Sequence, residues 1–106
     1  MTEKEKGTVL CAANSYIQKY YFNPDFERLP QSIKDELKIL CVSFTEAAGG
    51  NLTLEFDRDG HLQLLVQAAD GDFYFDEIES GLRISAYQRN KAQLFSQLEL
   101  FYRLTR

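Results

Sequence analysis

The chain has few of the side chains from which catalytic and metal sites are usually built. Its 106 residues include one histidine, two cysteines, one methionine and no tryptophan. Cys11 and Cys41 lie far apart in the sequence and form no CxxC pair, so a tetrahedral zinc site has no ligand set. We expect both thiols to be reduced core residues, and we predict no metal, no cofactor and no catalytic residue.

Phosphate-binding motifs are absent as well. The sequence contains no GxGxxG and no GKS/T, and the Gly49-Gly50 pair follows a predicted helix, where glycine commonly ends one. His61 follows a predicted hairpin turn, where a solvated histidine is expected. Because Cys41 falls on the apolar stripe of a predicted helix, a Cys-His nucleophile pair is disfavoured.

Acidic residues gather in two places. Asp57 and Asp59 begin like a calcium loop, but Gly60 comes too early and the closing glutamate is missing, so we predict a turn. A second acidic run could in principle hold Mg²⁺ or transfer protons. Its position at a loop and an exposed helix start favours helix capping and solubility instead. The members of this run are Asp70, Asp72, Asp76, Glu77 and Glu79.

The charge balance limits the possible partners. The net charge is −4 and the isoelectric point is about 4.9, with the basic residues scattered along the chain. Nucleic acids and anionic membrane surfaces both require clustered Lys and Arg, so neither is an expected partner. No apolar run approaches transmembrane length, and the first residues are too polar for a signal peptide. Elimination therefore predicts a cytoplasmic protein.

Hydrophobic periodicity predicts an α+β fold in one domain. We expect a flexible segment over 1–7 and a single domain over 8–106. Residues 30–48 carry an apolar stripe at helical spacing, opened by Pro30 and ended by Gly49. Alternating apolar residues over 52–56 and 62–68, joined by a turn at 57–60, predict a hairpin. An antiparallel hairpin or three-stranded sheet, with one face covered by two amphipathic helices, follows.

For two shorter segments the sequence permits more than one secondary structure. Residues 15–23 have a capping-box spacing and apolar positions that favour a short helix, although Lys19 to Asn23 has the composition of a strand. Phe73 to Phe75 could form a short third strand of the sheet.

The last third of the chain predicts one long helix over 76–106. Asp76 and Glu79 have N-cap and N3 chemistry, no proline interrupts the stretch, and Gly81 is a possible bend. About 30 residues at ~1.5 Å each make a rod of roughly 45 Å. A compact domain of this size is roughly 33 Å across. The helix would therefore extend beyond the domain, and its apolar end would have to be buried against another molecule. We predict that this molecule is a second copy of the chain, in a homodimer. The expected interface residues are Ile84, Tyr87, Leu94, Leu98 and Phe101.

Several runs of residues also resemble a known family. They are Leu10 to Tyr16 with Lys19 to Asn23, Leu29-Pro30 with Leu40 to Glu46 and Gly49-Gly50, and Phe75 to Ile78 with Leu94 to Tyr102. Together they resemble a domain-of-unknown-function family of small cytosolic proteins from anaerobic Gram-positive bacteria. The likeness spans residues 8 to about 103 and implies no activity, cofactor or catalytic residue.

Two functional hypotheses remain. The first is a non-enzymatic, cytosolic interaction or regulatory module that self-associates through its C-terminal helix and has a protein partner. The second is a small-ligand binder or minor enzyme with a pocket between the sheet and the N-terminal aromatic segment. Its walls would include Tyr16, Tyr20 and Tyr21.

Overall fold

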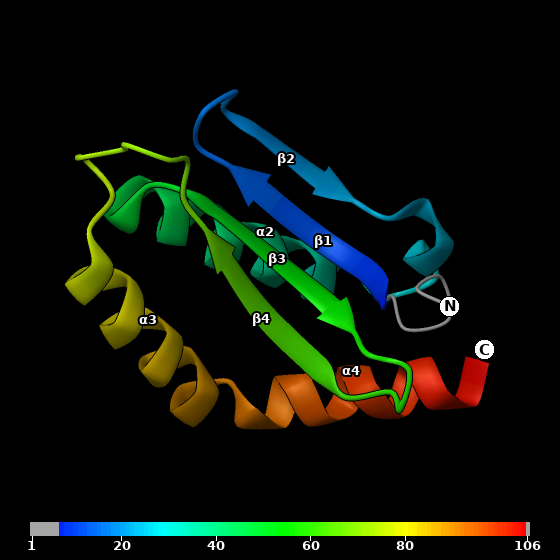
Figure 1. Cartoon of the computed structure of the whole chain (residues 1–106). Helices are drawn as coiled ribbons and strands as arrows, with labels where there is room; N and C mark the ends of the chain where they lie inside the picture. Colours follow the sequence, from blue (N-terminus) through cyan, green and yellow to red (C-terminus); the bar gives the residue numbers. More distant parts are fainter. Residues whose placement is uncertain (1–6, 106) are drawn as a thin grey trace.

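An antiparallel sheet of four strands, covered on one face by helices, makes up the described part of the chain (Figure 1). The computed structural model describes residues 7–105. The predicted flexible start therefore lies outside the described residues, except for Gly7. The elements in chain order are β1 (Thr8–Asn14), β2 (Lys19–Phe22), the 3-10 helix η1 (Pro24–Phe26), α2 (Gln31–Ala48), β3 (Asn51–Phe56), β4 (Leu62–Gln67), α3 (Glu77–Asn90) and α4 (Ala92–Thr105).

The strand order is β2-β1-β3-β4, and every neighbouring pair is antiparallel. The predicted hairpin is confirmed as β3 and β4, with Leu54 opposite Leu64. A bulge in β1 shifts the register between Val9 and Cys11. Because a bulge adds a residue without adding a pair, the adjacent Leu10 and Cys11 are both fully buried.

The preference for a short helix over 15–23 was wrong, and the strand alternative was right. Asn14 accepts the Tyr16 N–H at 2.8 Å through its side-chain Oδ1, which closes a turn at the end of β1. Gln18 then takes a left-handed conformation at φ 52°, which reverses the chain into β2. Pairing with β1 is what decides the matter, since the local sequence permits either structure.

Helix α2 forms as predicted. It begins after Pro30 and ends at Ala48, with Gly49 at φ 83° closing its last turn. Its buried stripe lies across β1, β2 and β3. The residues of that stripe are Leu37, Leu40, Cys41, Phe44 and Ala48.

The stretch expected to be one helix from Asp76 onward is two helices of 14 residues each. The division falls at Lys91, at φ −113°, and not near Gly81, which lies inside α3 with open space beside it. The Lys91 Nζ donates to Glu36 Oε2 on α2 at 2.7 Å, which holds the corner against the body of the protein. The corner lets α3 pack on α2 while α4 turns under β4 (Figure 1).

Aromatic contacts fix α4 to the sheet. The Phe56 and Tyr102 rings are stacked, with centroids 4.2 Å apart and planes 1° from parallel. The Tyr102 hydroxyl also lies 3.0 Å from Thr8 Oγ1, which connects α4 to β1. Glu99 accepts the Leu62 N–H at 2.7 Å and so occupies a backbone donor at the start of edge strand β4.

The predicted fold class is confirmed. The sheet has two strands more than the hairpin, because residues 8–22 supply β1 and β2. Phe73 to Phe75 lie in a loop and add no strand. Among the helices of residues 7–105, none is both long and apolar enough to cross a membrane.

Candidate functional site

The residues predicted to form a dimer interface lie in or beside the core of the protomer. Leu94 and Leu98 are 7% and 2% exposed, and Ile84, Tyr87 and Phe101 are half-buried against the same core. The Tyr87 hydroxyl donates to the Leu40 carbonyl at 3.2 Å. Because the chain turns at Lys91, no single helix is longer than the domain, and helix length no longer implies an end that extends beyond it. Self-association itself stays a prediction.

The three tyrosines predicted to line a pocket point to different places. Tyr20 packs toward the core beneath α2, whereas the next residue, Tyr21, lies half-exposed on the opposite face of the sheet. Tyr16 lies at the tip of the β1–β2 hairpin and contacts the loop that follows β4. Only Tyr20 contributes to the cleft beside this hairpin.

That cleft has a volume of about 600 Å³ and runs between the hairpin and α2. Its lining includes Ala13, Tyr20 and Val42, together with the cations Lys19 and Lys38 and one carboxylate, Glu46. The Lys38 ammonium lies 6.0 Å from the centroid of the Tyr20 ring, within cation–π range. The cleft could therefore accept a small anion with an apolar part.

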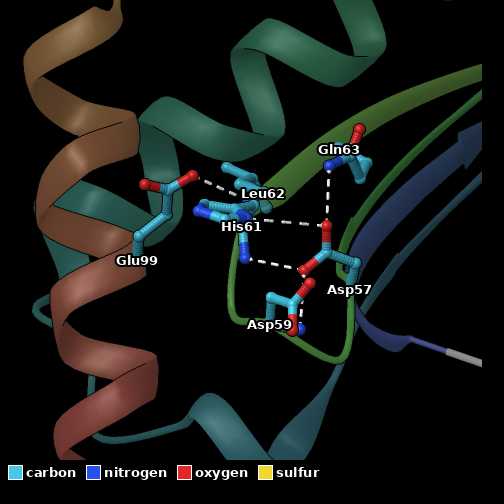
Figure 2. A network of polar contacts seen from close by, with 6 residues as sticks. All are labelled: Asp57, Asp59, His61, Leu62, Gln63 and Glu99. Atoms are coloured by element: carbon cyan, nitrogen blue, oxygen red, sulfur yellow. Dashed lines mark hydrogen bonds and ion pairs between the residues drawn. The ribbon is translucent and has the colours of Figure 1, made fainter.

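Three side chains of the kinds that can bind a metal ion lie together at the β3–β4 turn (Figure 2). Ligand atoms of Asp57, Asp59 and His61 lie within 4.8 Å of one another. Asp57 Oδ1 accepts the N–H groups of Asp59 and His61, each at 2.9 Å, and Oδ2 accepts Gln63 Nε2 at 3.0 Å. The His61 backbone bond is the main reason why the pKa of Asp57 is lowered. Because both oxygens of Asp57 already hold the turn together, the geometry supports the predicted turn.

Several strongly exposed apolar side chains lie in the loop before α3 and on α3 itself, and a site there was not predicted from the sequence. Phe73 and Tyr74 are 94% and 95% exposed in the loop between β4 and α3. Ile78 and Leu82, on the first turns of α3, are 77% and 64% exposed. We call these four residues the loop–helix patch. Single exposed apolar residues are ordinary, but Phe73, Tyr74 and Ile78 line one hollow, and large exposed apolar groups that lie together indicate a binding surface.

The loop that presents the patch is held in place on both sides of its aromatic residues. On one side, Tyr16 Oη donates to Asp72 Oδ2 at 2.5 Å and accepts the Ala69 N–H at 2.8 Å. On the other side, the Asp76 N–H donates to the Ala48 carbonyl at 2.9 Å, and the Asp76 side chain caps α3. Phe73 and Tyr74 are therefore presented by a fixed loop and not by a loose one.

Between these attachments, Phe75 turns inward and packs against the core. Gly50 makes this possible, because a Cβ on Gly50 would lie 3.0 Å from two atoms of the Phe75 ring. Two aromatic residues thus face water while the third anchors the loop.

Comparison with known proteins gives one finding. The profile of a family of unknown function, DUF6145, matches residues 7–106. The chain belongs to DUF6145. No curated protein and no solved structure matches it. The family resemblance expected from the sequence is confirmed in this respect, whereas a bacterial source and a cytosolic location stay predictions.

In this DUF6145 member the two cysteines are buried neighbours. Their sulfur atoms are 3.8 Å apart, joining β1 to α2, and neither thiol is exposed. The hydrogen bond to Cys11 and the burial of the group both raise the pKa of Cys41. Burial likewise raises the pKa of the nearby Tyr20 hydroxyl. Cys41 is thus held as a neutral thiol, which is a poor nucleophile.

We expect both thiols of the folded DUF6145 chain to resist alkylation. At pH 8, iodoacetamide should modify neither within an hour, whereas the same chain in 6 M guanidinium chloride should react fully within minutes, because only exposed thiolate reacts. Intact-mass spectrometry gives the counts. Fast modification of either cysteine in the native protein would show that the β1–α2 contact opens readily.

The Tyr16–Asp72 attachment should depend on pH. The Tyr16 hydrogen bond is the main cause that lowers the pKa of Asp72, so this contact stabilises the fold above the ordinary aspartate pKa and is lost as the pH falls through the lowered value. The bond to Asp72 also raises the pKa of Tyr16, so at high pH the contact persists beyond the ordinary tyrosine pKa. The protection of the Ala69 and Tyr74 amides, measured relative to the intrinsic exchange rate at each pH, should therefore fall below about pH 4.

The Tyr16→Phe variant should show the same loss of protection at neutral pH. Phenylalanine keeps the ring but can neither donate to Asp72 nor accept from Ala69. Amides of α2 provide the internal control, since their hydrogen bonds do not involve this loop. Unchanged protection of Ala69 in the variant would show that the loop is held without Tyr16.

Proposed function

We propose that this DUF6145 member is a non-enzymatic, cytoplasmic protein-interaction module, and that the loop–helix patch is its binding surface. The observation that carries the proposal is the near-complete exposure of Phe73 and Tyr74 in a loop that is fixed on both sides. Burying a large apolar side chain contributes about 1.5–3 kcal/mol. Aromatic residues in fixed positions are also the side chains that most often dominate protein–protein binding.

The geometry of α3 supports the proposal further. Ile78 and Ser80 are two positions apart, as are Leu82 and Ile84, and two positions on a helix correspond to a rotation of roughly 200°. Ser80 and Ile84 face the protein interior, so Ile78 and Leu82 point away from it. The protomer's own core does not bury Ile78 and Leu82, whereas a partner that lies on α3 would cover both side chains.

Site-specific photo-crosslinking tests this function. The photoreactive residue p-benzoylphenylalanine would replace Tyr74 in the full chain, expressed in its native cells. A matched control carries the same residue at Arg58, an exposed position in the β3–β4 turn. We expect an adduct with a second polypeptide from position 74 and none from position 58. Absence of any adduct at 74, or equal adducts at both positions, would contradict the proposal.

Self-association through the C-terminal helix is retained as a narrower proposal. On α4 the apolar side chains that lie open are Leu100 and Leu104, beside half-buried Phe101. Sedimentation velocity of the wild-type chain and of Leu104→Glu decides the point. A dimer that becomes a monomer in the variant supports it, and a monomeric wild type at 100 μM refutes it.

The cleft at the β1–β2 hairpin favours the alternative, a small-ligand binder. Its lining has two cations, Lys19 and Lys38, against the one carboxylate of Glu46, which favours anions, and Tyr20 offers an aromatic wall. A thermal-shift screen of anionic metabolites should then raise the melting temperature by several degrees. Loss of that shift in Lys38→Gln would place the ligand in the cleft, whereas no shift with any compound would count against this function.

A further inference from the structure

We infer that the loop–helix patch takes a basic amphipathic segment of a partner protein, one with apolar residues on one side and Lys or Arg beside them. This inference rests on the proposed function and specifies the chemistry of the partner. It follows from the charges along residues 68–82, which are all of one sign.

Acidic residues lie among and beside the patch residues in the sequence, and no free basic group lies near them along the chain. No Lys, Arg or His occurs between Gln67 and Arg83. Arg83, which ends this interval, is paired with Glu79 at 2.7 Å. Asp70, Asp76 and Glu77 are exposed, and Asp72 is half-exposed. The apolar surface is therefore bordered by carboxylates that have no cation of this segment to neutralise them.

The apolar and acidic groups also share one concave surface. Residues 68–78 line a hollow of about 720 Å³ in which Phe73, Tyr74 and Ile78 lie beside Asp70 and Glu77. A partner side chain that enters the hollow meets aromatic rings and carboxylates together. Lys and Arg suit such a surface, because their stems pack on apolar groups while their charged ends reach the acids.

Other occupants fit this surface less well. A second copy of the chain, docked patch to patch by two-fold symmetry, would place Asp70 and Glu77 against the same acidic residues of the partner copy. An anionic membrane and a nucleic acid would be repelled by the same carboxylates. An uncharged apolar segment would cover the aromatic residues but leave the surrounding acids without a partner.

A model peptide tests the inference directly. The probe is a fluorescein-labelled peptide of 18 residues, made of leucine and lysine with the leucines on one face of a helix. One control peptide has the same composition in scrambled order, and another carries glutamate in place of lysine. Fluorescence polarisation would measure binding to the full chain, in 50 mM and in 500 mM NaCl.

Two double variants and two matched controls locate the binding. Phe73→Ser with Tyr74→Ser removes the aromatic part, and Asp70→Asn with Glu77→Gln removes two charges beside it. The controls change equivalent groups elsewhere: Tyr21→Ser on β2, and Asp25→Asn with Glu27→Gln at η1, all exposed. Circular dichroism and melting temperature verify that each variant is folded.

We expect the wild-type chain to bind the amphipathic peptide at least about tenfold more tightly than the scrambled one. The aromatic double variant should lose about tenfold or more in affinity, and the charge double variant severalfold. High salt should weaken wild-type binding, because it screens the exposed charges. Both controls should stay within about twofold of the wild type.

Equal binding of the scrambled peptide, or equal losses in the η1 control, would reduce the effect to non-specific attraction and overturn the inference. Preference for the glutamate peptide, or no binding at all, would also overturn it. The proposed function is judged separately by the crosslink at position 74. An adduct there with an uncharged segment or a second copy keeps the function and rejects the basic partner, and the absence of any adduct rejects both.

Discussion

Replacement of Leu98 by alanine should lower the free energy of unfolding by about 2–5 kcal/mol, the usual cost of removing a buried leucine side chain and leaving a cavity. Leu98 is 2% exposed and belongs to the core under the sheet. Urea denaturation followed by tyrosine fluorescence or circular dichroism would measure the loss. An effect of this size is a large part of the stability of a small domain.

The same helix offers the matched control. Leu104→Ala removes the same atoms from a side chain that is 74% exposed, and in a monomeric chain its effect should stay within about 0.5 kcal/mol. Measurement at two protein concentrations separates a core from an interface. If Leu98 stabilises a dimer, its loss depends on concentration, whereas a residue of the protomer core gives the same value at both. A concentration-dependent loss would restore the predicted interface on this helix.

Replacement of Gly50 by alanine should be similarly costly, at about 3 kcal/mol. Gly50 has a φ of 68°, which costs about 1–2 kcal/mol for an L side chain. The added Cβ would also lie 2.6 Å from the Gln67 carbonyl oxygen, a backbone atom in β4 that cannot move without disturbing the sheet. Thermal and urea unfolding would both show the change.

Gly71→Ala isolates the first part of that cost, the conformational one. Gly71 has a φ of 77°, but a Cβ there would meet nothing within 4 Å. Its variant should lose only the conformational part, about 1–2 kcal/mol. Equal losses at the two positions would mean that β4 and the Phe75 ring can yield, and that the loop carrying the patch is less firmly held than its contacts indicate.

The elements with a clear local pattern could be predicted from the sequence. Pro30, the stripe through Leu37 and Phe44, and Gly49 define α2 without help from the rest of the fold. The alternation in β3 and β4, with Gly60 in the turn, is equally local. In both cases the apolar face, the start signal and the stop signal indicate the same element, so tertiary contacts had nothing to override.

Residues 15–23 show the opposite situation. Their apolar spacing permits a helix and their composition permits a strand, so only the hydrogen bonds of the partner strand β1 decide between them. This pairing joins the two strands of a hairpin and leaves no periodic signal in a segment as short as β2.

The candidate site was missed for a related reason. Ile78 and Leu82 form one apolar stripe, on a different side of the helix from a second stripe that includes Ile84 and Tyr87. A bend at Gly81 would have let both stripes face the core. The helix is continuous through Gly81, so one stripe faces α2 and the other faces solvent. Two apolar stripes of opposite phase on one uninterrupted helix were the available signal for an exposed binding surface.

The sequence by itself determined the α+β class, the boundaries of α2 and the β3–β4 hairpin, and the acidic surface, because each depends on residues that are neighbours along the chain. Tertiary structure alone decided the pairing of β1 with β2, the corner at Lys91 and the outward presentation of Phe73 and Tyr74. These three features depend on contacts with residues outside the segment concerned, namely the partner strand, Glu36 on α2 and the Tyr16 hydroxyl. Such contacts exist only once the chain has folded, and no local pattern encodes them.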